Sequence, residues 1–146
     1  MTLAQFAPSF FLLDGKHVAG IIPRSNGAGA YGGGSYDILG PTGNSLGYPT
    51  VAAKAGDVVE LFAVGLGPTN LTVPAGEAFS GAAQTTNLVN LLINNVNVIP
   101  SFAGLSGAGV YQISLTVPAG RGTGDVTLVA TVGGAETPPN VVISLQ

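Results

Sequence analysis

The chain of 146 residues has no cysteine, no tryptophan and a single histidine, His17. Without cysteine, a disulfide framework and a thiolate zinc site are excluded, and one histidine is too few for a histidine-cluster metal site. Charged residues make up only 8% of the chain, and the net charge is −3, whereas a typical soluble domain is about 25% charged. So few basic residues argue against a nucleic-acid partner and a polybasic membrane patch. We therefore expect no metal, no cofactor and no nucleic acid.

Long hydrophobic runs are also missing. No stretch reaches the roughly 18 uninterrupted apolar residues of a transmembrane helix, so no membrane span is expected. The first 13 residues are partly apolar, but they contain Pro8 and lack a basic segment, so they make a poor signal peptide. We expect that a signal was removed upstream or that the chain is a fragment of a longer one, with Met1 as an added start.

Apolar residues, glycine and proline are abundant. Hydrophobic residues make up 46% of the chain, which excludes simple disorder, and the length fits a single domain over residues 1–146. The 23 glycines and 10 prolines interrupt the apolar segments at short intervals. This is the pattern of short strands separated by turns, and no long amphipathic helix is evident.

Eight segments have the composition of strands, and their spacing predicts a β-sandwich. Asp14-Gly15, Asn94-Asn95 and Gly133-Gly134 are expected at turns between them. The segments are 9–13, 16–22, 57–64, 87–93, 96–99, 110–117, 126–132 and 140–145. Alternation predicts that one face of 57–64 carries Val59, Leu61 and Ala63, and that one face of 110–117 carries Tyr111, Ile113, Leu115 and Val117.

Residues 24–48 form a stretch rich in glycine and tyrosine, and the sequence predicts a long loop there. Long loops without regular structure are uncommon in compact domains and are often functional. Two interpretations stay open. Tyr31, Tyr36 and Tyr48 either anchor a surface loop through burial or contact a ligand or partner.

Catalytic motifs are weak. Residues 27–32 match GxGxxG, but no helix pattern follows, so dinucleotide binding is not expected. His17 lacks an evident nucleophile and is predicted as a surface or capping residue. The carboxylates are scattered along the chain, and turn chemistry explains Asp57 and Asp125. We therefore do not expect an enzyme.

Asparagines are concentrated between residues 87 and 97, interleaved with aliphatic residues. The pattern predicts a hairpin with asparagine on its exposed face and Asn94-Asn95 at its turn. The alternative is an amide-lined surface for carbohydrate or for strand pairing, with Asn94 and Asn95 as contact residues. Sugar-stacking aromatic residues are few, which weakens the carbohydrate interpretation.

Several segments resemble a known bacterial family. AGDVVELFAVGLGP at 55–68 resembles its "G-x-x-v-x-l-y-x-t-G-L-G-P" segment. FAGL at 102–105, GVYQI at 109–113 and VP at 117–118 resemble its core, VGG at 132–134 its last turn, and APSFF at 7–11 its start. The family is the uncharacterised C-terminal domain abundant in Solibacter and other Acidobacteria, which typically closes long secreted or surface proteins.

The resemblance implies an all-β, immunoglobulin-like sandwich of about 7–9 short strands, with 24–48 as a long glycine-rich loop. It also implies an extracellular or cell-surface location, and it supplies no catalytic or binding residues. Asn94-Asn95 stands where the family usually has Gly-Gly, an exchange that keeps the turn possible. Family members usually carry further β-rich sequence before the segment that matches 7–11.

The low charge and the apolar excess point to a non-catalytic structural or assembly module. Apolar surface beyond the core should meet another domain or another copy of the chain. Open sheet edges at the two ends are the expected contacts, with Phe10, Phe11, Val141 and Ile143 as edge residues, and head-to-tail repetition would make a filament. The alternative is a carbohydrate- or surface-binding module of a secreted bacterial protein.

Overall fold

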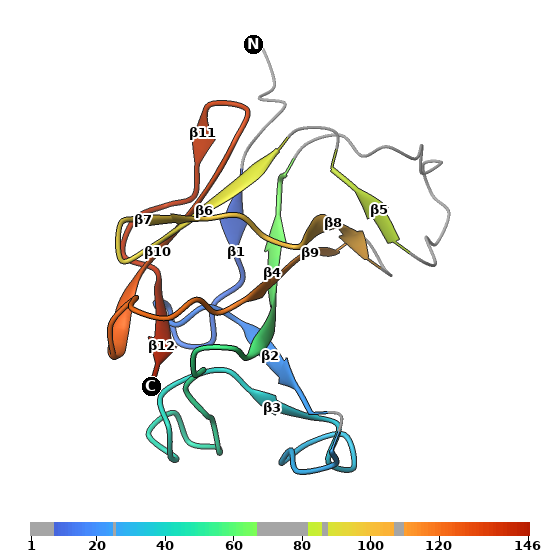
Figure 1. Cartoon of the computed structure of the whole chain (residues 1–146), viewed down its shortest axis with the longest axis vertical. Coiled ribbons are helices and arrows are strands. Elements are labelled where there is room, and N and C mark those ends of the chain that lie inside the picture. The colour runs from blue at the N-terminus through green and yellow to red at the C-terminus, as the bar shows by residue number, and fades with distance from the viewer. Residues whose placement is uncertain (1–7, 25, 67–81, 86–87, 107–109) are drawn as a thin grey trace.

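The computed structural model describes residues 8–24, 26–66, 82–85, 88–106 and 110–146, and the regular structure in them is entirely β (Figure 1). Its twelve strands form two antiparallel sheets that pack together. In the view of Figure 1, β10 and β12 lie on the left, and β2, β8 and β5 lie on the right. The expected all-β sandwich is confirmed, whereas the immunoglobulin-like strand order stays a prediction.

The larger sheet has seven strands in the order β3-β2-β4-β9-β8-β5, with β1 also paired to β4. The long strands β4 and β9, of seven residues each, lie at its centre, and fully buried residues recur at alternate positions in both. Its strands are β1 (Ser9–Phe10), β2 (Gly20–Pro23), β3 (Tyr36–Ile38), β4 (Val58–Val64), β5 (Ala82–Gln84), β8 (Phe102–Ser106) and β9 (Val110–Thr116).

The smaller sheet has five strands in the order β11-β10-β6-β7, with β12 also paired to β10. Its longest strand, β10, pairs with β6 and β11 through its second half and with β12 through its first half. The strands are β6 (Val89–Ile93), β7 (Val96–Val98), β10 (Gly124–Val132), β11 (Ala135–Glu136) and β12 (Val142–Leu145).

The core lies between the sheets and takes residues from both. Leu61 and Ile113 of the larger sheet and Leu91 and Ile143 of the smaller sheet are all 0% exposed and belong to one hydrophobic cluster. The residues predicted to share a face in 57–64 and in 110–117 do so, and in both strands that face points to the core, with Tyr111 packed against the cluster while partly exposed. Alternation places these side chains on one face of each strand.

Three predicted turns are confirmed. Asn94 and Asn95 have φ of 52° and 63° and join β6 to β7 in a two-residue hairpin, as asparagine can because it tolerates positive φ. Gly133 and Gly134, also at positive φ, join β10 to β11. Gly15 has φ of 91°, and the chain folds back across it so that the N–H of Leu13 donates to the carbonyl of His17.

Four strands were not expected from the sequence: β3, β5, β8 and β11. Strand β3 lies inside 24–48, so that stretch is not loop throughout. These strands have two to five residues and little alternation. Pairing with a neighbour creates them, as β3 pairs with β2 and β11 with β10.

Candidate functional site

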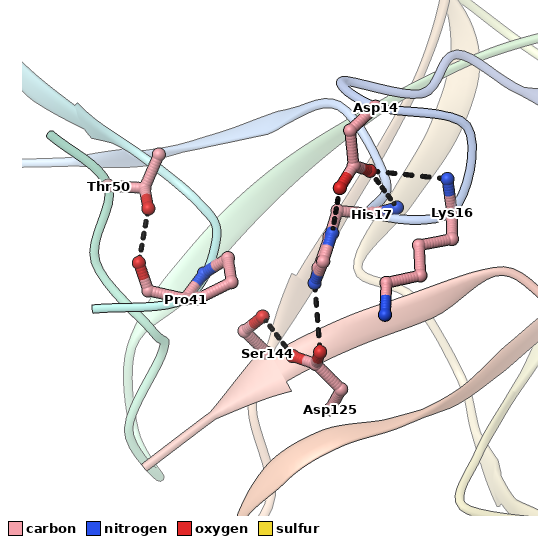
Figure 2. Close-up of polar contacts among 7 residues, drawn as sticks. All are labelled: Asp14, Lys16, His17, Pro41, Thr50, Asp125 and Ser144. Carbon is pink, nitrogen blue, oxygen red and sulfur yellow. Dashed lines mark hydrogen bonds and ion pairs between the residues drawn. The ribbon is translucent and has the colours of Figure 1, made fainter. Parts of the chain in front are cut away.

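Among the described residues, the most highly connected polar group centres on His17 (Figure 2). Its Nδ1 lies 2.7 Å from Oδ2 of Asp14, and its Nε2 lies 2.9 Å from Oδ2 of Asp125. The hydroxyl of Ser144 donates to Oδ1 of Asp125 at 2.7 Å. We call Asp14, His17, Asp125 and Ser144 the histidine cluster.

Local structure explains how these side chains meet. Asp14 begins a tight turn in which its Oδ1 accepts the backbone N–H groups of Lys16 and His17, a common use of aspartate in turns. Asp125 on β10 and Ser144 on β12 are directly opposite in the strand pair. Backbone bonds between the 16–18 segment and Val142 bring the turn beside β12. The histidine cluster therefore connects the turn at Asp14 to β10 and β12.

Both carboxyl groups favour their ionised forms. Burial alone raises the pKa of Asp14, but hydrogen bonds from His17 and from the Lys16 backbone, together with the charge of His17, outweigh it and lower the pKa to about 2. Burial also raises the pKa of Asp125. The Ser144 hydroxyl, the imidazole and the charges of His17 and Lys16 outweigh that effect and hold the pKa below its usual value.

The geometry suits a structural tie. Both ring nitrogens of His17 face carboxylate oxygens, and the imidazolium satisfies both because it carries an N–H on each nitrogen. Ser144 is buried and its hydroxyl bonds to Asp125 rather than to the ring, so the described residues lack the serine–histidine contact of nucleophilic catalysis. Within the described part of the chain, no group of three or more His, Asp and Glu residues could hold a metal ion.

Of the two roles predicted for His17, surface residue or capping residue, the surface role was wrong, because His17 is only 5% exposed. The spacing Asp14-x-x-His17 at a turn was a usable signal for the first contact. Asp125 lies 108 residues further along the chain, and nothing local in the sequence indicates that contact.

A second ionic group holds the glycine-rich stretch. Nε of Arg24 lies 2.9 Å from Oδ2 of Asp37, and its Nη1 lies 3.6 Å from Oδ1 of Asp57. Oδ1 of Asp37 accepts the backbone N–H of Ala30 at 2.9 Å. Arg24 thus links the loop, β3 and the start of β4.

The three tyrosines predicted as contact residues are half-buried. Tyr31 and Tyr36 stack on one another, with ring centroids 6.0 Å apart and planes 20° apart. The hydroxyl of Tyr31 donates to the carbonyl of Pro49. Each ring therefore covers one face of the other, which favours the anchoring interpretation over a sugar-stacking platform.

Asn94 and Asn95 lie away from these tyrosines in the fold. They form the turn at the end of the smaller sheet, where the side-chain amide of Asn94 donates to the carbonyl of Arg121. The tyrosine loop continues the larger sheet at β2 and β3. The structure therefore does not bring the predicted contact residues together into one site.

The predicted edge residues separate into two groups. Phe10, Val141 and Ile143 have 5%, 5% and 0% exposure and belong to the core, so their side chains do not form an outer edge. The backbone of β12 is bonded on both sides, to β10 and to the segments at 16–18 and 53. The C-terminal edge expected from the sequence is therefore closed. Phe11 is 44% exposed.

Exposed hydrophobic side chains gather on two surfaces. The first, called the Phe11 surface, consists of exposed Phe11 and Val64 and half-buried Phe62, which alternation puts on the outer face of the larger sheet. The second, called the Ile99 surface, consists of Leu88 and Ile99, with exposures of 67% and 65%, on the outer face of the hairpin β6–β7. Val96, which is 43% exposed, lies on the other face with Val98. Sequence reasoning found only Phe11, because it cannot distinguish an outward aliphatic residue from a core one.

No helix of the described chain is long and apolar enough to cross a membrane. No protein-family model matches the sequence, and no curated protein or solved structure is significantly similar to it.

Proposed function

We propose that this protein is a non-catalytic structural module that associates with copies of itself or with neighbouring domains, as part of a surface structure or filament outside the cell. The observation that carries the proposal is the pair of exposed apolar surfaces, one on each sheet. A subunit that forms an open array needs two separate contact surfaces. The extracellular location rests on the resemblance to the acidobacterial domain family.

The distribution of charge supports association. Arg24, Asp14, Asp37, Asp57 and Asp125 are engaged in the two internal ionic groups. They are therefore less available to keep molecules apart in solution, on a chain that is only 8% charged. Exposed Phe11 and Ile99 then favour burial against a partner.

The carbohydrate-binding alternative has less support. It needs a flat platform of exposed aromatic rings. Tyr31 and Tyr36 stack on each other, and Asn94 belongs to a turn of the other sheet.

The test of the proposal is the size of the purified chain across a dilution series, measured by light scattering and negative-stain microscopy. We expect filaments or a fixed oligomer that dissociates on dilution. Phe11→Ser should reduce association while leaving the thermal midpoint of unfolding nearly unchanged, because Phe11 lies outside the core cluster.

Glu136→Gln is the matched surface control, since Glu136 is exposed on the short strand β11. It should leave association unaltered. A monomer at every concentration would contradict self-association and leave a terminal module of a longer protein as the remaining structural role.

A further inference from the structure

Strand β7, which has three residues and is followed by Ile99 and Pro100, is an exposed edge that carries no charge. It is the last strand on its side of the smaller sheet, and among the described residues no backbone hydrogen bond joins its outer side to another segment. Val96 and Asn97 are exposed, and so is Ile99 just beyond the strand. Proteins normally protect such edges with charges, prolines, bulges or very short strands, because an open edge pairs with other chains.

The opposite edge of the same sheet has that protection. Strand β11 has only two residues, one of which is the charged Glu136, and Pro138 and Pro139 follow it. Edge strand β3 of the larger sheet is covered, because Tyr31 exchanges backbone hydrogen bonds with Tyr36. Of these three edges, β7 is the one that has neither a charged residue nor, in the part of the chain that the structure describes, a segment bonded along its outer side.

The hairpin geometry defines which backbone groups of β7 are free. The two-residue turn at Asn94-Asn95 closes on the pair Ile93 and Val96, which exchange hydrogen bonds. Antiparallel pairs alternate between bonded and non-bonded, so Asn97 opposite Leu92 is a non-bonded pair. The N–H and C=O of Asn97 consequently point away from β6. By the same alternation, the N–H and C=O of Ile99 also point away from β6.

The charge pattern indicates what pairs with this edge. Residues 78–120, which include β5 to β9, contain no charged residue. Two copies of an edge that carried a charge would repel each other when paired. Two copies of β7 meet without such repulsion, and each offers the same donors and acceptors to the other.

We propose that β7 pairs with β7 of a second copy, antiparallel and about a two-fold axis at Val98, so that the two small sheets become one continuous sheet. Asn97 of each copy lies opposite Ile99 of the other, with about four backbone hydrogen bonds. Leu88 and Ile99 of both copies then lie along one face of the joined sheet. This inference rests on the proposed self-association and names its surface.

The symmetry has a consequence for assembly. A two-fold contact uses the same surface on both copies and closes at a dimer. A filament therefore needs a second contact, and the Phe11 surface on the other sheet is separate from β7 and available for it.

Asn97→Pro tests the pairing directly. Proline removes the outward N–H of Asn97. This N–H takes no part in the hydrogen bonds between β6 and β7, and edge strands tolerate proline at such positions. We expect the dissociation constant of the dimer, measured by sedimentation velocity on the full chain, to rise at least about tenfold. The far-UV spectrum and thermal midpoint should stay close to those of the original protein. Asn97→Ser keeps the N–H and is the matched control, which should still dimerise.

A charge exchange tests the same contact without altering the backbone, should Asn97→Pro fold poorly. Across the two-fold axis the two Asn97 side chains are diagonal neighbours, roughly 7–8 Å apart. Asn97→Lys and Asn97→Glu should each weaken dimerisation alone, and an equimolar mixture should restore it.

The outcomes separate the two proposals. Association of the original chain that is unaffected by Asn97→Pro and by either charge would overturn the β7 pairing and leave self-association intact. A monomeric original chain would overturn both. Loss of association in the proline and single-charge variants, with recovery in the mixture, supports the pairing.

Discussion

The histidine cluster predicts how stability responds to acid. The pKa of Asp14 in the folded protein is about 2, below the ordinary value of 3.8. A lowered folded-state pKa adds stability that is present above pH 3.8 and is lost as the pH falls toward 2. Asp125, whose pKa is also lowered, adds to the loss in the same direction. We expect the free energy of unfolding to decrease as the pH falls below 4.

The magnitude follows from the pKa difference of Asp14. A lowering from 3.8 to about 2 corresponds to at most roughly 2.5 kcal/mol. The Asp14 side chain is 30% exposed, so solvent screening reduces its contribution to about 1–1.5 kcal/mol. Asn keeps an oxygen for the turn but cannot ionise, so Asp14→Asn isolates the charge.

Urea unfolding between pH 7 and 2.5, followed by far-UV circular dichroism, measures the effect in a chain without tryptophan. We expect Asp14→Asn to be less stable than the original protein by about 1–1.5 kcal/mol at pH 7. The difference should shrink toward zero near pH 2, where Asp14 itself is protonated.

Glu136→Gln is the control for loss of one carboxylate on an exposed strand, and it should differ little from the original protein at any pH. An Asp14→Asn variant whose deficit is equal at pH 7 and pH 2.5 would refute the reasoning, because the loss would then not come from ionisation.

Three further predictions each compare two substitutions, made at neighbouring positions or at one position. Thermal or urea unfolding measures the loss of stability in each variant. Gly34→Ala should lower the free energy of unfolding by about 2–4 kcal/mol, because its φ is +98° and an added Cβ would lie 2.3 Å from a backbone oxygen. Gly33→Ala, with open space around it, should lower it by about 1 kcal/mol. Equal losses in the two variants would contradict this prediction. Asn95→Val should cost about 1–2 kcal/mol at φ 63°, and Asn95→Gly should stay within about 0.5 kcal/mol. Phe10→Ala should cost about 3–5 kcal/mol, since Phe10 is 5% exposed, and Phe11→Ala less than about 1 kcal/mol; the reverse order would place β1 in the wrong register.

The sequence alone was enough for features that depend on neighbours along the chain. Alternation in 57–64 and 110–117 identified the side chains that share a face, because a strand places successive side chains on opposite sides. Asn94-Asn95 and Gly133-Gly134 identified two hairpin turns, because few residues accept positive φ. These features gave the fold class and the sheet-forming segments.

Only the tertiary structure decided the features that depend on residues far apart. Phe10 and Phe11 look equivalent in sequence, and pairing with β4 turns Phe10 inward and leaves Phe11 outside. His17 meets Asp125 because β10 and the first turn pack together. Which strand edge stays open also depends on the order of strands, and it is β7 rather than the C-terminal β12. Periodicity reports which side chains share a face, whereas strand order and register across the sheets determine what that face meets.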